Sequence, residues 1–266
     1  MSNSEENTNN VPILVNRASN ENERIPRLTN TTYLRDYFQQ TEDNREFNIG
    51  YIDAIKSPGN VRMLSLNPHG FRPFDQRKVI MMQQAINRLA IDIVLLQETN
   101  TKWTSKNISQ VERNMKAIDR ESVVLTSDSK EWDVTPSDYL PGGLCSIFFS
   151  KTSPLVDAKK VVKGRLGNWM AVRLEGKGKR LEIINLYRIP STSNYGVKCS
   201  LTQYNRIDGN MSSPSVYRKE LFDDIKRYIQ SNPDITDIII RGDYNQNICD
   251  REIKKFHEEI GIHNIH

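Results

Sequence analysis

The 266-residue sequence lacks the features that mark membrane, secreted and disulfide-bonded proteins. No stretch approaches the roughly 18 consecutive apolar residues that a membrane-spanning helix needs. The first six residues are polar and acidic, unlike a secretory signal with a basic start and an apolar centre. The three cysteines, Cys145, Cys199 and Cys249, lie far apart and form no CxxC pair. We therefore predict a protein without membrane contact, not secreted, in a reducing intracellular compartment, nuclear or cytoplasmic.

The net charge of +4 is unevenly distributed along the chain. Residues 1–60 hold 6 basic and 9 acidic side chains, whereas the remaining residues hold 31 basic and 24 acidic ones. The densest basic stretch is 151–180. A polyanionic partner such as nucleic acid would explain this bias, because lysine and arginine gain affinity by displacing condensed counterions. A solvated loop would explain the stretch equally well, and charge alone does not separate the two interpretations.

Composition also divides the chain into two parts. Residues 1–30 contain eight asparagines and little that could build a core, which is typical of disorder. Ser57-Pro58-Gly59 is a turn signal and a natural boundary. We therefore predict a polar, largely disordered arm and linker over residues 1–58, and one domain over residues 59–266.

Apolar periodicity in the second part predicts an α/β or mixed α+β domain in which helices cover sheets. Apolar runs predict strands over residues 61–66, 91–96, 144–150, 169–175, 181–187 and 235–240. Helical spacing predicts helices over residues 75–90, 215–229 and 251–260, and Gly176-Lys177-Gly178-Lys179 predicts a turn between two strands. The strand–helix–strand order of residues 61–96 further predicts parallel pairing of those two strands.

Three of the predicted strands end in polar residues that suit phosphate chemistry: Asn67, Glu98, and Asp243 with Asn245. In α/β architectures ligands gather beyond the carboxyl ends of strands. One carboxylate, together with water and phosphate oxygens, suits Mg²⁺, and asparagine amides can donate to phosphate oxygens without adding charge. Taken singly, each segment has a simpler interpretation as a turn or a polar strand end. Their joint occurrence at strand ends favours a phosphate-handling site.

The residues around these strand ends form an ordered set of motifs. They are Met63-Leu64-Ser65-Leu66-Asn67 with Gly70, Val94-Leu95-Leu96-Gln97-Glu98-Thr99, Gly142-Gly143-Leu144, Ile184-Asn185-Leu186-Tyr187-Arg188-Ile189-Pro190 and Gly242-Asp243-Tyr244-Asn245. By this set, residues 60–266 resemble the endonuclease/exonuclease/phosphatase superfamily of DNase I and exonuclease III-like enzymes. The segments Glu98–Trp103, Asp138–Gly143 and Tyr217–Glu220 are closest in character to retrotransposon-type endonuclease domains.

This resemblance implies a four-layer sandwich of two mixed β-sheets flanked by helices, and Mg²⁺ as the cofactor, with Mn²⁺ as a substitute. It implies nucleic acid, above all DNA, as the partner. The implied roles are metal ligation by Glu98 and Asn67, phosphate contact by Asn67 and Tyr187, orientation of the attacking water by Asp243, stabilisation of the phosphorus by Asn245, and substrate binding by Asn100 and Arg188.

The sequence departs from the family pattern near its C-terminus. The family pattern ends with an Asp that contributes to the metal site and a Ser-Asp-His motif that supplies the catalytic acid/base pair. No Ser-Asp-His occurs in these 266 residues. We therefore expect a C-terminally incomplete domain, missing its last strands, that is nearly or completely inactive by itself and belongs to a longer polyprotein. Exposed sheet surface left by missing strands would favour a partner or aggregation.

Three functions remain open at this point. The first is a Mg²⁺-dependent endonuclease domain of a retroelement-like protein, in which Trp103, Tyr195 and Tyr204 could stack on bases. The second is a phosphomonoesterase of the same superfamily, and the third is a non-catalytic remnant that binds nucleic acid. Trp103 is more often a packing residue, and His69 more often a loop histidine, than a functional group.

Overall fold

The computed structural model describes residues 56, 61–128, 142–191, 205, 213–235 and 237–262. Nearly all of the predicted arm over 1–58, and the aromatics Tyr195 and Tyr204, lie outside these residues. Lys56 is the described part of the arm. Its Nζ donates to Asp92 Oδ2 at 2.5 Å and to the Ala90 carbonyl at 2.9 Å, so this end of the predicted linker contacts the domain.

The first sheet contains four strands in the order β1-β2-β4-β3. They are β1 (Met63–Leu66), β2 (Ile93–Leu96), β3 (Val123–Ser127) and β4 (Leu144–Phe148). The predicted parallel pairing of β1 with β2 is confirmed, while β4 runs antiparallel to both β2 and β3. This sheet is therefore mixed, and the carboxyl ends of β1 and β2 lie at the same edge.

The second sheet is also mixed, in the order β5-β6-β7-β8. Its strands are β5 (Val162–Lys163), β6 (Trp169–Gly176), β7 (Lys179–Tyr187) and β8 (Asp237–Asp243). β7 and β8 pair in parallel, and β6 and β7 form a hairpin. Lys177 and Gly178 have φ of 51° and 74°, the two positive values of a type I′ turn, which confirms the predicted turn.

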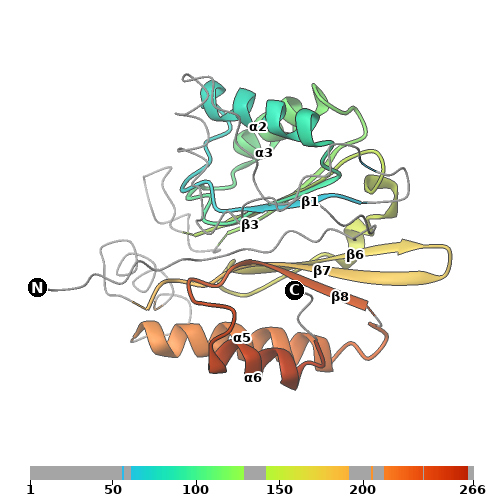
Figure 1. Ribbon diagram of the computed structural model, residues 1–266. Helices are drawn as coiled ribbons and strands as arrows, with labels where there is room; N and C mark the ends of the chain where they lie inside the picture. The colour runs from blue at the N-terminus through green and yellow to red at the C-terminus, as the bar shows by residue number, and fades with distance from the viewer. Residues whose placement is uncertain are drawn as a thin grey trace, which may run out of the picture.

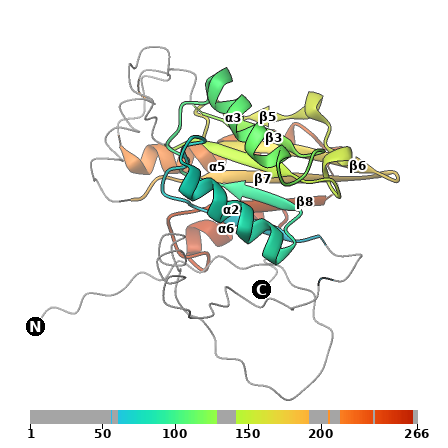
Figure 2. The same ribbon diagram turned by 90° about the horizontal axis from the view of Figure 1, so that it is seen from above.

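Two helices cover the outer face of the first sheet (Figures 1 and 2). Helix α2 (Gln76–Leu89) begins at Asp75, whose side chain accepts from the Lys78 N–H, and α3 (Ser105–Lys116) begins at Thr104, which accepts from the Asn107 N–H. Neither α3 nor β3 was predicted. Both lie in a segment where apolar residues are sparse and the runs are short.

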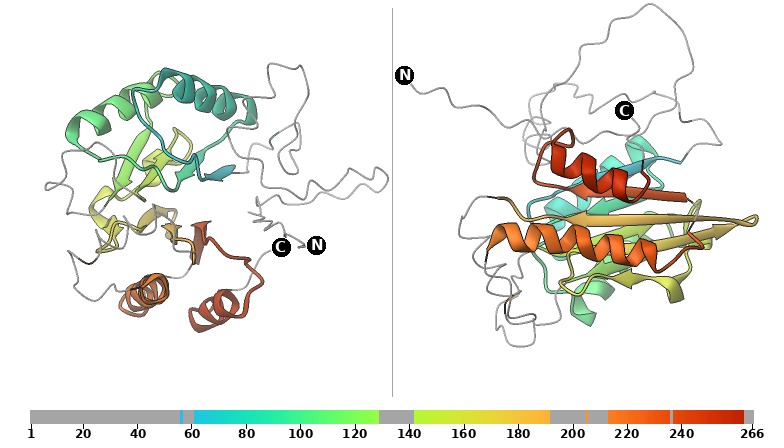
Figure 3. Two further views of the ribbon diagram at one scale, coloured as in Figure 1. Left: turned by 90° about the vertical axis from the view of Figure 1, so that its left-hand side faces the viewer. Right: turned by 90° about the horizontal axis from the view of Figure 1, so that it is seen from below.

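Helices α5 (Pro214–Gln230) and α6 (Arg251–Glu259) lie side by side on the outer face of the second sheet (Figure 3). Short 3₁₀ turns at Ser153–Leu155 and Ala158–Lys160 lead from β4 to β5. No helix in the described ranges combines the length and apolar character of a membrane span.

Figure 1 shows the four layers, and three separate apolar clusters lie between them. One lies between the sheets and includes Leu95, Phe148 and Met170. A second joins the first sheet to α2 and α3, and the third joins the second sheet to α5 and α6. Burial of these side chains is the main stabilising contribution. The predicted four-layer sandwich of two mixed sheets flanked by helices is confirmed.

A buried polar contact also connects the two sheets next to the carboxyl end of β2. Gln97 Nε2, directly after β2, donates to Asn185 Oδ1 of β7 at 2.8 Å, and Asn185 Nδ2 donates to Ser146 Oγ of β4 at 3.2 Å. Both amides are almost completely buried. Because buried amides must be bonded in a defined geometry, this contact fixes the register of one sheet against the other beside Glu98.

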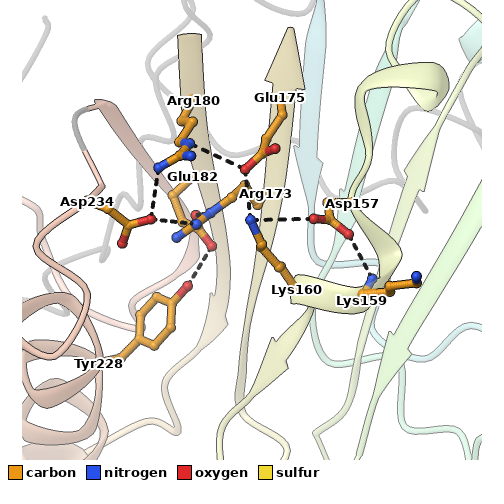
Figure 4. Close-up of polar contacts among 9 residues, drawn as sticks. All are labelled: Asp157, Lys159, Lys160, Arg173, Glu175, Arg180, Glu182, Tyr228 and Asp234. Carbon is orange, nitrogen blue, oxygen red and sulfur yellow. Dashed lines mark hydrogen bonds and ion pairs between the residues drawn. The ribbon is translucent and has the colours of Figure 1, made fainter. Parts of the chain in front are cut away.

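Three cations of the basic stretch 151–180, Lys160, Arg173 and Arg180, form ion pairs (Figure 4). Arg173 Nε lies 2.9 Å from Glu182, and Lys160 Nζ lies 3.1 Å from Glu175. Asp234 accepts from both Arg173 and Arg180. These pairs flank the β6–β7 hairpin, at the opposite end of β7 from Tyr187, so these three cations do not form a nucleic-acid surface beside the strand ends.

Candidate active site

The carboxyl ends of β1, β2 and β8 meet at one edge of the sandwich, and a single amide group connects them. Asn67 Nδ2 donates to Glu98 Oε2 at 2.7 Å and to Asp243 Oδ2 at 2.7 Å. Asn67 and Asp243 are 176 positions apart in the sequence and come from different sheets. The structure therefore brings together the three strand-end residues that the sequence singled out.

The orientation of Asn67 is fixed by its own backbone neighbourhood. Its Oδ1 accepts from the His69 N–H at 2.8 Å, which is an Asx turn. The simpler interpretation of Asn67-Pro68 as a turn therefore holds together with the functional one. With Oδ1 used in this way, the amide nitrogen is directed at the two carboxylates.

Asn245 is held in a tight turn against the end of β7. Its backbone N–H donates to Asp243 Oδ1 at 2.9 Å, and its Nδ2 donates to the Arg188 carbonyl at 2.6 Å. The Arg188 N–H donates to the Asp243 carbonyl at 2.8 Å. Strand β8 was predicted to end at residue 240, but its pairing with β7 continues through Asp243, so this carboxylate stands on a paired strand rather than on a loop.

Unfavourable backbone conformations are concentrated at this edge. Six non-glycine residues in the described ranges have positive φ. Two have local explanations, because Ala90 caps α2 and Lys177 lies in the hairpin turn. The other four belong to the strand-end loops and are His69, Glu98, Asn100 and Asn245. Each costs about 1–2 kcal/mol relative to ordinary backbone, and such strain clusters at functional sites.

The loop that carries Glu98 is braced by the two consecutive glycines of the Gly-Gly-Leu motif. Asn100 Oδ1 accepts from the Gly142 N–H at 2.9 Å, and Asn100 Nδ2 lies 3.4 Å from Glu98 Oε1. The Thr99 N–H donates to the Gly143 carbonyl at 3.2 Å. A Cβ at Gly143, where φ is +80°, would come within 2.8 Å of Thr99 Oγ1, so the motif allows close approach of the two loops.

The electrostatic environment of Asp243 combines opposing effects. Burial raises the pKa of its carboxyl group, while hydrogen bonds from Asn67 and from the Asn245 backbone lower it. The nearby charge of Glu98 raises the pKa further. Two carboxylates that share one amide donor repel each other, and a cation at this edge would relieve that repulsion.

Arg188 and Tyr187 occupy the site differently from the other predicted residues. The Arg188 guanidinium is fully buried, lies 4.3 Å above the Phe222 ring and donates to Gln246 and Glu252. Burial lowers the pKa of Arg188 to about 10. A buried guanidinium in this position does not support the predicted substrate contact. It favours a structural role, in which Arg188 stabilises the turn after β8 through Gln246 and Glu252. Tyr187 is paired with Asp243 across the strands and packs in the core between the sheets.

Arg218 is a site-supporting residue that the sequence did not single out. Its Nη1 donates to the Ile189 carbonyl at 2.5 Å, and its Nη2 donates to Gln246 Oε1, the acceptor that Arg188 also uses. A signal was available, because Arg218 lies at helical spacing from the buried Leu221, Phe222 and Ile225. A cation on the apolar side of a helix indicates a buried polar partner.

The donor set at this edge fits a hard divalent cation. Glu98 provides a carboxylate whose side chain is 19% exposed, and Asp243 provides a second. The Asn67 amide contacts both, and the exposed His69 imidazole has its Nδ1 3.5 Å from Glu98 Oε1. Within the described ranges, no three His, Cys, Asp or Glu side chains gather into a metal cluster. A site with so few protein carboxylates suits Mg²⁺, which keeps several waters and takes oxygen ligands from its substrate.

Comparison with known proteins identifies the architecture. No protein-family profile matches the sequence, and no protein of curated function matches it. Among solved structures, the AP endonuclease LMAP from Leishmania major superposes with a TM-score of 0.50 at 12% identity, over 77% of this chain and 61% of that one. The fold shared with this AP endonuclease is the four-layer sandwich that the motif resemblance implied.

Two further solved structures are similar to this chain. An AP endonuclease from Archaeoglobus fulgidus has a TM-score of 0.43 at 11% identity, over 76% of this chain and 70% of that one. A Staphylococcus aureus beta toxin variant with bound magnesium ions has a TM-score of 0.46 at 14% identity, over 76% and 71%.

Proposed function

We propose that this domain is a Mg²⁺-dependent phosphodiesterase that acts on nucleic acid, DNA above all, as an endonuclease domain of a retroelement-like protein. The observation that carries the proposal is the Asn67 amide, which bonds at once to Glu98 and Asp243 at the ends of strands from both sheets. Free thiols at Cys145 and Cys249 suit the reducing intracellular compartment proposed for it.

Each polar residue of the site has a separate role in the proposed hydrolysis. Glu98, with Asn67 beside it, would hold Mg²⁺, which supplies charge neutralisation at the phosphate. Asp243 would accept a hydrogen bond from the attacking water and orient it. An amide nitrogen carries two hydrogens, so Asn245 can donate to a phosphate oxygen while its other N–H holds the Arg188 carbonyl. Phosphate contact by Tyr187 and substrate binding by Asn100 complete the proposal.

The 266-residue polypeptide is expected to turn over slowly. It contains no Ser-Asp-His motif, and loss of acid–base catalysis typically lowers rates by about 10²–10⁴-fold. The groups proposed to hold the metal, Glu98 and Asn67, are present and in contact. We therefore expect binding without efficient cleavage.

The test is a cleavage assay on supercoiled and linear DNA with the full chain, with MgCl₂ or with EDTA. We expect trace nicking that requires Mg²⁺ and disappears in Glu98→Ala, together with Mg²⁺-enhanced DNA binding. Robust Mg²⁺-dependent cleavage lost in Glu98→Ala would contradict the low turnover but support the site. Release of phosphate from a 3′-phosphorylated oligonucleotide, without nicking, would instead identify the phosphomonoesterase. DNA binding without cleavage, with an affinity that neither Mg²⁺ nor Glu98→Ala changes, would identify the non-catalytic remnant.

A further inference from the structure

We propose that Phe74, on the loop that leaves the active site, is a stacking platform for an unpaired base, and that Arg72 and Lys106 bind the adjoining phosphates. The inference rests on the proposed function and narrows its substrate to nucleic acid with an unstacked base, single-stranded or locally opened. It concerns a surface next to the catalytic edge and not the catalytic groups themselves.

The exposure of Phe74 has no packing explanation. Its side chain is 48% exposed, whereas Phe71 on the same loop is 2% exposed and Trp103 on the neighbouring loop is 5% exposed. Trp103, which the sequence offered as a stacking residue, is therefore a core residue. An exposed aromatic ring is large, stiff and apolar on both faces, which are the properties that a base-stacking platform requires.

Hydrogen bonds from α3 and from the loop after β2 hold the loop that carries Phe74 in place. Asn114 Nδ2 of α3 donates to the Pro73 carbonyl at 2.8 Å, directly before Phe74. The Phe71 N–H donates to the Thr99 carbonyl at 2.7 Å, and Thr101 Oγ1 donates to the Phe71 carbonyl at 2.5 Å. A ring on a braced loop loses little conformational entropy when a base stacks on it.

The charges around the ring are mostly positive. Lys106 Nζ at the start of α3 lies 5.2 Å from the centre of the Phe74 ring, and Arg72 and Arg77 are exposed on either side in the sequence. The one acid in residues 70–78, Asp75, uses its side chain to cap α2. Residues 101–111 contain no acid. An aromatic ring among cations is complementary to a base flanked by phosphates.

This surface lies within reach of a strand that occupies the active site. The Gly70 N–H donates to the Glu98 carbonyl at 2.9 Å, so the loop starts from the proposed metal ligand itself. In the other basic region, 151–180, Lys160, Arg173 and Arg180 are engaged in ion pairs on the hairpin side (Figure 4). The Phe74 loop combines cations with an exposed ring beside the site, and the nucleic-acid contact is assigned to it.

The experiment measures binding of the full chain to two fluorescein-labelled DNA strands in EDTA. One strand carries all of its bases, and the other carries abasic residues in its centre. The variants are Phe74→Ala, Phe74→Tyr and Lys106→Gln. Ile80→Ala is the matched control, because Ile80 is also 48% exposed but lies in α2.

We expect Phe74→Ala to weaken binding of the base-containing strand about tenfold, with little change for the abasic strand. Phe74→Tyr should retain the affinity, because it retains the ring. Lys106→Gln should lower the affinity for both DNA probes and reduce the dependence of that affinity on salt concentration. The Ile80→Ala variant should match the native protein.

Equal affinity of Phe74→Ala and the native chain for the base-containing strand would overturn the inference, as would an equal loss on both strands or a complete lack of DNA binding. A Phe74-dependent affinity for anionic lipid vesicles without one for DNA would reassign the surface to a membrane and overturn it too. Failure of the proposed hydrolysis is distinguishable, because Mg²⁺ and Glu98→Ala would then have no effect while the Phe74 dependence persisted.

Discussion

A Gly242→Ala variant is expected to lose most of the folding stability of the domain. Gly242 lies in β8 opposite Leu186 of β7, with φ of +155°, directly before Asp243. A Cβ at this position would lie 2.0 Å from the Leu186 carbonyl oxygen, which is backbone and cannot move aside without breaking the β7–β8 pairing. We expect a loss of at least about 4 kcal/mol, a size reserved for severe steric conflicts, against a typical total of about 5–15 kcal/mol.

Urea unfolding followed by circular dichroism would measure this loss. Gly178→Ala is the matched control, because Gly178 also has positive φ, +74°, but a Cβ at that position would meet no atom within 4 Å. The Gly178→Ala variant should lose only about 1–2 kcal/mol of folding stability, which is the cost of a left-handed backbone conformation in a residue with a Cβ. Equal losses for the two variants would show that the close approach of β7 and β8 at Gly242 is not the constraint we infer.

An Asn67→Asp variant is expected to make folding stability strongly dependent on Mg²⁺. The native amide donates to both Glu98 and Asp243 at 2.7 Å. The substitution removes both donors and places a third carboxylate against the first two. Hydrogen bonds to charged groups contribute about 1.5–3 kcal/mol each, so we expect a loss of at least about 3 kcal/mol without metal. Bound Mg²⁺ should restore much of it, because a ligand that binds only the folded state stabilises that state.

Urea midpoints in EDTA and in saturating MgCl₂ would test this expectation. Asn87→Asp adds the same charge on the exposed side of α2 and should lower both midpoints slightly and equally, because a carboxylate in the last turn opposes the helix dipole. Native-like stability of Asn67→Asp in EDTA would mean that the two hydrogen bonds contribute little. A loss that Mg²⁺ does not reverse would mean that the edge does not bind the ion.

The strands and the edge that carries the site were predictable because both follow from local patterns. Buried strands give continuous apolar runs, and a polar residue after such a run must lie at a sheet edge. The prediction placed Asp243 after the strand, because sequence hydropathy ends at Ile240, whereas the β7–β8 ladder continues to Asp243. Helix α3 was missed because its apolar side consists of Ile108, Val111 and Met115 among polar residues.

Side-chain direction was the part of the site that the sequence could not predict. Motif order correctly grouped Asn67, Glu98 and Asp243, but it gave no information on which way the Arg188 side chain turns. That direction depends on Glu252 of α6 and on Gln246, which are distant in the sequence. Phe74 was missed for the same reason, because exposure of one aromatic residue among several depends on tertiary packing.

The central claim is that Glu98 holds a divalent cation at the meeting point of the three strands, and calorimetric titration of the full chain with MgCl₂ tests it most directly. The partner for comparison is Glu98→Gln, which keeps the shape of the side chain and an oxygen acceptor for Asn67. We predict one Mg²⁺ site in the native chain and a loss of affinity in Glu98→Gln greater than the about 10–100-fold that a supporting residue would cost. Unchanged Mg²⁺ affinity in Glu98→Gln, or no Mg²⁺ binding by the folded native chain, would contradict the claim.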